Sequence, residues 1–401
     1  MKAEKYKWPP AMKYLLLPFY GTYLKRKYGL TLVSDDEKSL RILLENGGGL
    51  VFSNHVHTLD PFLISAVFPY HIRWVAGAYL FKMKAVGYLL RNWVGCISKS
   101  QGKNDLGTIR AIKNALEENT IVGVFPEGTR SWDGEMMDIT TGSAKIMKIF
   151  RRPVVIINIE GGYNRKPRWA KNDRKGNITI RIKKILSSEE LEEMSISDVE
   201  AVLRENLSFS SSSWQKENRM PFEGRKRAEG IERLLYYCPY CLSAGTVSSN
   251  GNMLSCSSCR KSAEVSVYDE IIDEESMMSE RDAHIRAREE LERNIRKNDG
   301  TLLFPLERGI LFQKEEKGRL VKLSSSFIFS MTAGSIRFSF SSHKEKVREM
   351  TFPFSEISAL VINAKQSIEF THMKNTYRFR LEETKSPLKV FDAYCIIRGG
   401  N

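Results

Sequence analysis

The sequence predicts an α/β domain followed by a small cysteine-rich element and a C-terminal β-rich domain. Two short apolar segments, 49–53 and 120–125, are typical of buried strands, and each is followed at once by a polar motif. Four cysteines then form two closely spaced pairs between residues 238 and 259. From Thr301 onward, short alternating segments give way to a final helical pattern. These features set the order of the domains along the chain.

The first motif places a histidine and an aspartate near the end of a strand. The strand predicted at 49–53 brings Asn54 and His55 to its carboxyl end, and a helix is predicted from Asp60. A neutral histidine can accept a proton from a hydroxyl, and a carboxylate on its other ring nitrogen fixes the tautomer and stabilises the imidazolium. His57 is a rival base, because two residues further along an extended segment it lies on the same side.

The second motif is a turn that suits an anion. The strand predicted at 120–125 leads into residues 126–131, which put Glu127, Gly128 and Arg130 on a turn. A guanidinium offers a planar fork of donors for a phosphate, and backbone amides of the turn can add more. Ligand sites of open α/β sheets lie beyond the carboxyl ends of strands, so the two motifs predict one shared cleft. Such a cleft suits transfer of a group onto a hydroxyl beside a phosphate.

These residues carry a resemblance to a known family. The stretch Asn54-His55 to Asp60 resembles the H-x4-D signature of the glycerolipid acyltransferases, of the lysophosphatidate acyltransferase type. Residues 125–131 resemble that family's F-P-E-G-T-R-S block. The resemblance covers roughly residues 30–230 and implies an α/β acyltransferase domain with a mixed sheet, in which His55 is the general base and Asp60 its partner.

The resemblance also implies a set of residues that bind the substrates. In this sequence the set is Asn54, Lys99, Glu127, Gly128, Thr129 and Arg130. Lys99 stands where the family's block usually ends in arginine; it keeps the charge but loses the bidentate geometry. Ile157 stands where a second proline is common. Both departures bear on the identity of the acceptor more than on the reaction.

The four cysteines have the spacing of a metal site. They follow the pattern C-x2-C-x14-C-x2-C and are Cys238, Cys241, Cys256 and Cys259. This spacing is typical of a structural zinc ribbon, in which four thiolates fill a tetrahedral site and leave no position open for catalysis. Disulfides are the alternative, but the rest of the chain has an intracellular character. We therefore expect one structural zinc and no catalytic cofactor.

Charge and aromatic content predict contact with a membrane. The chain of 401 residues carries a formal net charge of +14, and it has no apolar run of about 18 residues that would predict a transmembrane helix. No nucleic-acid module is apparent, so anionic lipid surfaces and phosphate-bearing substrates fit better than nucleic acid. Residues 1–30 mix aromatics with cations and lack a small-residue cleavage site. They suit an interfacial segment, or a helix packed on the catalytic domain.

We divide the chain into five parts: an N-terminal interfacial segment (1–30), an acyltransferase domain (31–235), a zinc ribbon (236–265), a charged connecting helix (266–299) and a C-terminal β-rich domain (300–401). The last part loosely resembles a pleckstrin-homology-like barrel. That module would bind lipid or a protein partner; otherwise it is a scaffold that caps the ribbon.

Taken with the resemblance, these features predict a peripheral membrane acyltransferase on the cytoplasmic face. The family moves a fatty acyl group from a thioester to a lysophospholipid, here most simply from acyl-CoA or acyl carrier protein to 1-acylglycerol-3-phosphate, giving phosphatidate. One alternative is another lysophospholipid acceptor. The other is an inactive acyltransferase-like protein that binds lipid or protein through its C-terminal parts, against which the intact His55, Asp60, Glu127 and Arg130 argue.

Overall fold

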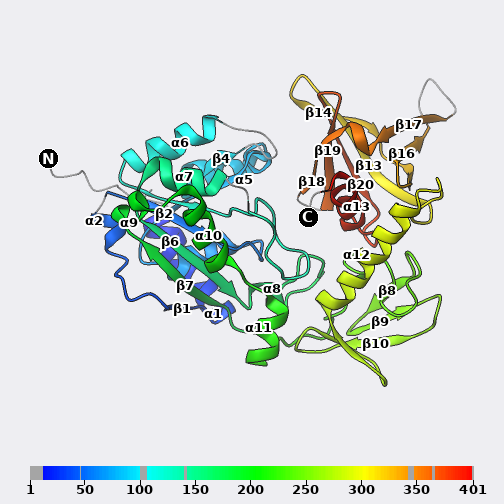
Figure 1. Ribbon diagram of the computed structural model, residues 1–401, viewed down its shortest axis with the longest axis horizontal. Coiled ribbons are helices and arrows are strands. Elements are labelled where there is room, and N and C mark those ends of the chain that lie inside the picture. The colour runs from blue at the N-terminus through cyan, green and yellow to red at the C-terminus, as the bar shows by residue number, and fades with distance from the viewer. Residues whose placement is uncertain are drawn as a thin grey trace. The chain divides into compact units, whose positions relative to one another are not determined.

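A computed structural model describes residues 12–399, apart from 46, 100–105, 140–141, 342–346 and 364–365. The chain forms two compact units, shown in Figure 1. Unit 1 takes in the residues up to Arg168 together with Arg174–Phe222, and unit 2 takes in Trp169–Asp173 and the residues from Glu223 onward. The five-part division predicted from the sequence is finer than this and stays a prediction.

Unit 1 is built on a seven-stranded mixed sheet, as predicted. Its strands are β1 Thr31–Ser34, β2 Gly49–Ser53, β3 Ile72–Gly77, β4 Ile97–Lys99, β5 Ile121–Val124, β6 Val154–Glu160 and β7 Thr179–Leu186. The order across the sheet is β1-β7-β6-β2-β5-β3-β4. All neighbouring strands are parallel except β6 and β7, so β2, β3, β4, β5 and β6 end at the same edge.

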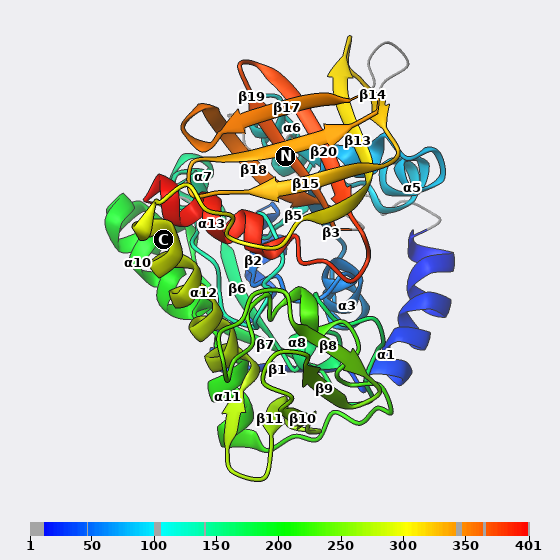
Figure 2. The ribbon, with the colours of Figure 1, turned by 90° about the vertical axis from the view of Figure 1, so that its right-hand side faces the viewer.

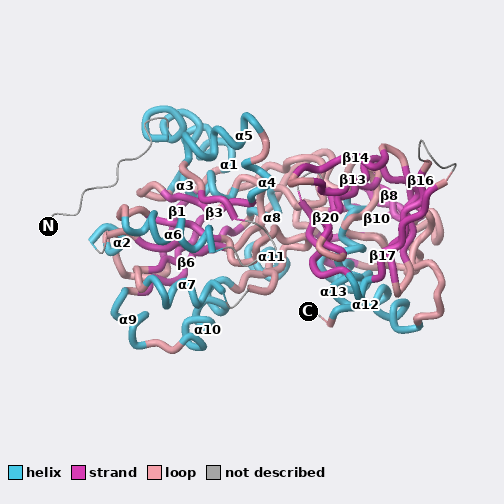
Figure 3. Tube along the Cα trace, turned by 90° about the horizontal axis from the view of Figure 1, so that it is seen from above, coloured by secondary structure: helices cyan, strands magenta, loops and turns pink. Residues whose placement is uncertain are grey.

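Helices cover both faces of this sheet, as Figure 3 shows. The helices of unit 1 are η1 Met12–Gly21, α1 Thr22–Tyr28, α2 Ile42–Glu45, α3 Asp60–Val67, α4 Ala78–Phe81, α5 Lys84–Leu89, η2 Leu90–Val94, α6 Leu106–Glu117, α7 Gly142–Phe150, α8 Gly162–Arg165, α9 Ser188–Glu193, α10 Ile196–Leu207 and α11 Ser211–Asn218. Successive strand residues point to opposite faces. Val51 packs with α1 and α3, whereas Leu50 and Phe52 pack with α6, α7 and α10. All five residues of β2 are buried, which explains its continuous apolar sequence.

Close packing around β5 positions the residues that follow it. Gly123 lies against the indole of Trp74, and a Cβ at Gly123 would come within 2.3 Å of that ring. The missing side chain therefore lets Trp74 lie flat over the end of β5. Trp74 in turn stacks on Phe125, with ring centroids 4.8 Å apart. This stack forms one wall of the region beyond β2 and β5.

Unit 2 contains a small five-stranded antiparallel sheet, in which Cys256 ends β9 and the other three cysteines of the motif lie in turns outside the strands. Its elements are η3 Ile231–Arg233, β8 Val247–Asn250, β9 Met253–Cys256, β10 Ser262–Val265, β11 Glu270–Ile272, β12 Met277–Ser279 and the long helix α12 Glu280–Lys297. The charged connecting helix predicted over 266–299 is therefore helical only in its second half. Ile271 is fully buried where β11 pairs with β10, and Ser279 begins the helix by accepting a hydrogen bond from Asp282.

The C-terminal part of unit 2 is β-rich, as predicted. Its elements are β13 Glu307–Glu316, β14 Arg319–Ser324, β15 Phe327–Met331, β16 Ser335–Phe340, β17 Arg348–Pro353, η4 Phe354–Glu356, β18 Ile357–Asn363, β19 Ser367–His372, β20 Asn375–Leu381 and the final helix α13 Leu388–Arg398. The eight strands form one antiparallel sheet in the order β17-β16-β15-β13-β20-β19-β18, with β14 also paired to β13. Its core is aromatic: the rings of Phe312 and Phe338 stack with centroids 4.3 Å apart.

Candidate active site

His55 and Asp60 meet at the carboxyl end of β2. Nδ1 of His55 lies 2.7 Å from Oδ2 of Asp60. The same oxygen accepts hydrogen bonds from the backbone N–H groups of Val56 and His57, both at 2.8 Å, and the Asp60 side chain is fully buried. Three donors converge on one carboxylate oxygen, and this carboxylate fixes the proton of His55 on Nδ1. Nε2 of His55 is then the ring nitrogen that can accept a proton.

The ring of His55 lies in a protected but accessible position. It stacks on Phe125, with centroids 4.4 Å apart, and 22% of its side chain is exposed. Burial lowers the pKa of His55; hydrogen bonding to its carboxylate partner raises it, and the positive charges of Arg130 and Arg168 lower it further. His55 is therefore neutral at neutral pH, as a general base requires.

His57 has different surroundings from His55. Its side chain is buried, its Nδ1 accepts a hydrogen bond from the backbone N–H of Leu59 at 3.0 Å, and its ring packs edge-on against Tyr28 in α1. The expectation that both rings lie on one side assumed an extended segment. The chain instead turns between β2 and α3, and this turn directs His57 into the core.

Glu127 joins the two motifs through the backbone. Its Oε1 accepts a hydrogen bond from the N–H of His55 at 2.7 Å, and its Oε2 accepts one from the N–H of Met137 at 2.8 Å. A further bond runs from the N–H of Ser131 to the carbonyl of His55 at 2.9 Å. Burial raises the pKa of Glu127 to about 8, and the two backbone donors oppose this rise. Both carboxylate oxygens thus hold protein backbone in place.

The turn after β5 borders open space, and its Arg130 side chain points toward the loop that holds His55 and Asp60. Gly128 has φ of +68°, and a Cβ there would meet no heavy atom within 4 Å. Nη1 of Arg130 donates to Oγ1 of Thr58 at 2.9 Å, so the side chain reaches the loop between His55 and Asp60. Burial lowers the pKa of Arg130, and the charge of Asp60 opposes that shift. An arginine remains charged across the physiological range.

Arg168 joins this group and was not singled out from the sequence. It follows α8, which itself follows β6, the strand next to β2. Its Nη1 donates to Oγ1 of Thr129 at 2.8 Å and to the carbonyl of Arg130 at 2.6 Å, and its guanidinium lies 4.6 Å from the ring centroid of Trp132. Burial, and then the charge of Arg130, hold the pKa of Arg168 below its usual range. The sequence signal that could have identified Arg168 is a cationic residue beyond the end of a third apolar strand, β6.

The remaining predicted substrate-binding residues lie in two different places. Asn54 is buried; its Oδ1 accepts from the N–H of Ile159 at 2.8 Å and its Nδ2 donates to the carbonyl of the same residue at 3.4 Å. It therefore ties β2 to β6. Lys99 is exposed at the end of β4, the edge strand. β4 is three strand spacings from β2, roughly 14 Å.

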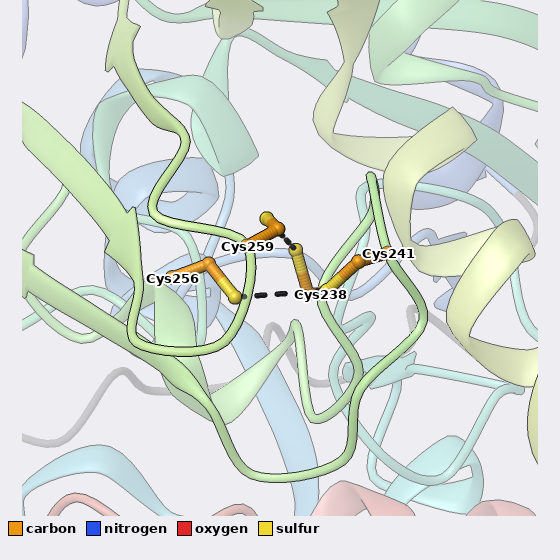
Figure 4. Close-up of side chains that lie close together, drawn as sticks. All are labelled: Cys238, Cys241, Cys256 and Cys259. Atoms are coloured by element: carbon orange, nitrogen blue, oxygen red, sulfur yellow. Dashed lines mark hydrogen bonds between the residues drawn. The ribbon is translucent and has the colours of Figure 1, made fainter.

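The four cysteines come together as the sequence predicts, in the cluster drawn in Figure 4. Their sulfur atoms all lie within 4.8 Å of one another. Sγ of Cys238 is 3.9 Å from that of Cys259, and Sγ of Cys241 is 3.7 Å from that of Cys256. A disulfide has sulfurs about 2.05 Å apart. Four sulfurs at about 2.3 Å from a central zinc lie roughly 3.8 Å apart, so the donor set fits a tetrahedral zinc.

The two cysteine pairs have matching backbone geometry. Cys238 accepts through its carbonyl from the N–H of Leu242, and its own N–H donates to the carbonyl of Ser243, both at 3.0 Å. Cys256 does the same with the two residues that follow its pair, also at 3.0 Å. The residue after each pair has positive φ, +58° at Leu242 and +63° at Arg260. Two equivalent turns thus present two sulfurs each, which is how a ribbon builds a four-thiolate site.

Comparison with known proteins agrees with this geometry. Residues 32–160 match the family model described as Acyltransferase. A 1-acyl-sn-glycerol-3-phosphate acyltransferase of Helicobacter pylori is 30% identical over 128 residues, covering 31% of this chain and 54% of that protein. The chain therefore spans about half the length of this curated relative.

Two solved structures also show similarity. The 1-acyl-sn-glycerophosphate (LPA) acyltransferase PlsC of Thermotoga maritima is 25% identical, with 49% of this chain and 80% of that chain covered and a TM-score of 0.36. The N-terminal PH domain of human ARAP2 is 19% identical, with 23% of this chain and 76% of that chain covered and a TM-score of 0.17.

The α/β fold and the two strand-end motifs define unit 1 as an acyltransferase domain. The family match and the curated relative support the resemblance to glycerolipid acyltransferases, of the lysophosphatidate acyltransferase type, that the sequence motifs indicate.

Proposed function

We propose that this protein transfers a fatty acyl group from an acyl thioester to a hydroxyl of a lysophospholipid. The observation that carries the proposal is the catalytic pair at the end of β2, with His55 Nδ1 held 2.7 Å from Asp60 Oδ2 and Arg130 reaching the same loop. The pair supplies a base, and the guanidinium supplies an anchor for a phosphate close to that base.

The reaction follows from this arrangement. The acceptor hydroxyl gives its proton to Nε2 of His55 while its oxygen attacks the thioester carbonyl. Asp60 stabilises the imidazolium that forms. When the tetrahedral intermediate collapses, the carbon–sulfur bond breaks and the imidazolium returns the proton to the departing thiolate. The products are an ester and a free thiol, and no residue of the protein is acylated.

We propose 1-acylglycerol-3-phosphate as the acceptor and phosphatidate as the product. The guanidinium of Arg130 suits a phosphate, and the Helicobacter relative is named as an acyltransferase for this acceptor. A lysophospholipid with a larger head group is the alternative. The position of Lys99 on the edge strand favours neither acceptor. The acyl donor is acyl-CoA or acyl carrier protein.

A product analysis tests the proposal. Purified protein is incubated with each donor and a panel of lysophospholipids that share one acyl chain, and the products are identified by mass spectrometry. The proposal expects phosphatidate from 1-acylglycerol-3-phosphate. A His55→Ala variant, purified in the same way, controls for copurifying activity. Absence of any diacyl product with both donors would contradict the proposed function.

We also propose that unit 1 binds to the cytoplasmic surface of a membrane. None of the helices in the described ranges is long and apolar enough to cross a bilayer. The η1–α1 segment packs on the domain through Leu24 and Tyr28, yet leaves Phe19 70% exposed and Tyr23 53% exposed. The segment therefore has features of both interpretations of the sequence, a helix packed on the domain and an interfacial segment. Residues 1–11 of the predicted interfacial segment lie outside the described residues.

A second exposed apolar element supports the membrane proposal. The α5 region exposes Met83, Val86 and Tyr88 beside the exposed Lys82 and Lys84. Figures 2 and 3 place α5 on the same side of unit 1 as η1 and α1. Aromatic and apolar side chains among cations are typical of a surface that binds at a bilayer interface.

Vesicle sedimentation tests this surface. We expect a Phe19→Ser, Tyr23→Ser double variant to bind anionic vesicles more weakly than the wild type. Ile149→Ser, which changes an exposed residue of α7 on the other face of the sheet, is the matched control. Binding by the wild type should fall with added salt, because the Debye length shortens from about 10 Å at 0.1 M to about 3 Å at 1 M. Equal binding by all three proteins would show that the η1–α1 segment is not part of the membrane-binding surface.

For unit 2 we propose one structural zinc, held by Cys238, Cys241, Cys256 and Cys259. Its support is the match between the sulfur separations and a tetrahedral site, and thiolate ligands accord with a reducing compartment. Metal analysis should give one zinc per chain for the wild type and for Cys395→Ser, which removes a cysteine outside the cluster. A Cys238→Ser, Cys241→Ser variant should hold none. A zinc-free wild type with disulfide-linked cysteines would overturn the assignment.

We propose a pleckstrin-homology-like barrel for the C-terminal sheet. Its support is the topology: β13 pairs with β14 and β15 on one side and with β20 on the other, every pairing is antiparallel, and a helix follows the last strand. Such a module would bind lipid or a protein partner. An experimental structure of the full chain, superposed on pleckstrin-homology domains, tests the fold. An open sheet would contradict it.

A further inference from the structure

We propose that Thr58 is a positioning residue for Arg130, and that its hydroxyl orients the guanidinium for the phosphate of the acceptor. The contact is a hydrogen bond of 2.9 Å from Nη1 of Arg130 to Oγ1 of Thr58, between residues 72 apart in the chain. This inference rests on the proposed function and deepens it, because it gives a role to a residue of the first motif other than the histidine and the aspartate. Both ends of the contact are held in place by the surrounding structure.

Hydrogen bonds fix the loop on either side of Thr58. The backbone N–H of His57 donates to Oδ2 of Asp60 at 2.8 Å, and the backbone N–H of Leu59 donates to Nδ1 of His57 at 3.0 Å. The acceptors of these two bonds are buried side chains. The hydroxyl of Thr58 therefore has a defined position relative to the catalytic pair.

The local backbone does not use the hydroxyl of Thr58. A threonine just before a helix commonly caps it through the side-chain oxygen. Here α3 begins at Asp60, and its N-cap residue, Leu59, makes no side-chain cap. In the part of the chain that the structure describes, Arg130 is the one hydrogen-bond partner of the Thr58 hydroxyl. Thr58 is also exposed, so burial of the side chain does not explain the contact.

The other end of the contact leaves most of the guanidinium available. The residue after Arg130 is Ser131, whose N–H donates to the carbonyl of His55 at 2.9 Å and so ties the turn to the catalytic loop. A guanidinium has five N–H donors. Over the described ranges, the Arg130 side chain donates one of them, from Nη1, to Thr58. The edge formed by Nε and Nη2 is thus left for a bidentate contact with a phosphate.

A side chain that is ordered in advance binds its ligand more tightly. Arginine has many rotamers, and ordering such a side chain only when the ligand arrives weakens binding by about 2- to 10-fold. The bond to Thr58 orders the guanidinium of Arg130 before the acceptor binds, so this loss is avoided. Because the acceptor in this bond is a neutral hydroxyl, it orients the guanidinium without cancelling its charge.

Two substitutions at Thr58 separate its hydroxyl from its shape. Thr58→Val removes the hydroxyl and keeps the branched side chain, whereas Thr58→Ser keeps the hydroxyl. Each is made in the full-length wild type and in Arg130→Ala. Thr351→Val, at an exposed threonine of β17, is the matched control for the same chemical change. The probe is a long-chain alkyl phosphate, which has no hydroxyl that could be acylated, and its binding is measured by calorimetry.

We expect Thr58→Val to weaken binding of the alkyl phosphate by about 3- to 10-fold and to raise the acceptor KM by a similar factor. Thr58→Ser should recover most of that loss, because it keeps the oxygen that accepts from Arg130. Thr351→Val should bind like the wild type. In Arg130→Ala, the further change Thr58→Val should have no effect on binding, since the hydroxyl then has no guanidinium to orient and the two losses are not additive.

Equal losses in Thr58→Val and Thr58→Ser, or a full additional loss in Arg130→Ala, would show that Thr58 does not act through Arg130 and would overturn the inference. A wild type that does not bind the alkyl phosphate would overturn it as well. If Thr58→Val melts at a lower temperature than the wild type, Thr58→Ala removes the hydroxyl in its place. The calorimetry needs no turnover, so a wild type that shows the coupling but transfers no acyl group contradicts the proposed function alone.

Discussion

Replacing Glu127 by glutamine tests whether this carboxylate holds the backbone or touches the acceptor. In the structure Oε1 accepts the N–H of His55 at 2.7 Å, and Oε2 accepts the N–H of Met137 at 2.8 Å. Glutamine has almost the same shape but offers only one acceptor at this position. Its amide nitrogen must therefore face one of the two backbone N–H groups, and that group loses its partner.

The size of the effect follows from this count. One buried donor without an acceptor costs about 1–3 kcal/mol. For a domain of about 150–250 residues, 1 kcal/mol lowers Tm by roughly 2–4 °C, so unit 1 of Glu127→Gln should melt about 2–12 °C lower. The backbone of His55 is also released on one side. Because a misplacement of about 1 Å can reduce turnover by roughly 100-fold, we expect kcat to fall by about 10- to 100-fold.

Thermal melting and steady-state kinetics distinguish the two roles. If Glu127 acts through the backbone, the acceptor KM should stay within about twofold of the wild type while kcat and Tm fall. Glu117→Gln, an exposed acid on α6 with 59% of its side chain accessible, makes the same chemical change away from the site. An unchanged Tm with a raised acceptor KM and an intact kcat would refute the backbone role and place Glu127 against the acceptor.

Three further predictions concern the base and the cations. His55→Ala should lower kcat by about 100- to 10,000-fold, the usual contribution of a general base, whereas His57→Ala should lower Tm more than turnover; equal kinetic losses would reassign the base. Arg130→Lys should raise the acceptor KM less than Arg130→Ala does, and identical constants for both variants would exclude a bidentate contact. Removing the charge at Arg168 should raise the pKa of His55, so the acidic limb of kcat/KM should move to higher pH in Arg168→Gln; a downward shift would contradict this electrostatic link.

Local patterns in the sequence were sufficient to predict that His55 lies beside Asp60 and that the four cysteines come together. His55 and Asp60 are only five residues apart, and the strand before them and the helix after them fix their separation. The cysteines come in two tight turns whose geometry is set within each pair. In both cases local structure fixes most of the geometry. The tertiary fold is needed only to bring the two cysteine turns together and to place the loop with His55 and Asp60 next to the turn after β5.

Other features depend on which strands become neighbours, and sequence patterns do not contain that information. Arg168 reaches the site because β6 lies beside β2, although the two strands are about a hundred residues apart in the chain. The two backbone partners of Glu127 come from separate loops. Charge density over 266–299 predicted one helix, but pairing with β10 buries Ile271, and the first half of this segment holds the two short strands β11 and β12.

The charges around His55 predict that its pKa changes when the acceptor binds. In the free protein, burial and the charges of Arg130 and Arg168 lower the pKa of His55. A bound dianionic phosphate would offset those positive charges and raise that pKa, because an opposite charge nearby favours the protonated imidazole. His55 would thus become a stronger base when the acceptor is in place.

The pH profiles of the wild type should show this effect. The acidic limb of kcat/KM reports the free enzyme, and that of kcat reports the substrate complex. Protonation of His55 removes activity in both, so the limb of kcat should lie at higher pH than the limb of kcat/KM. In Arg168→Gln both limbs should move to higher pH, since the charge of Arg168 lowers the pKa of His55 with or without bound phosphate. A wild-type kcat limb at the same or lower pH would mean that the phosphate does not influence the imidazole, and the acceptor would then have to bind away from the two guanidiniums.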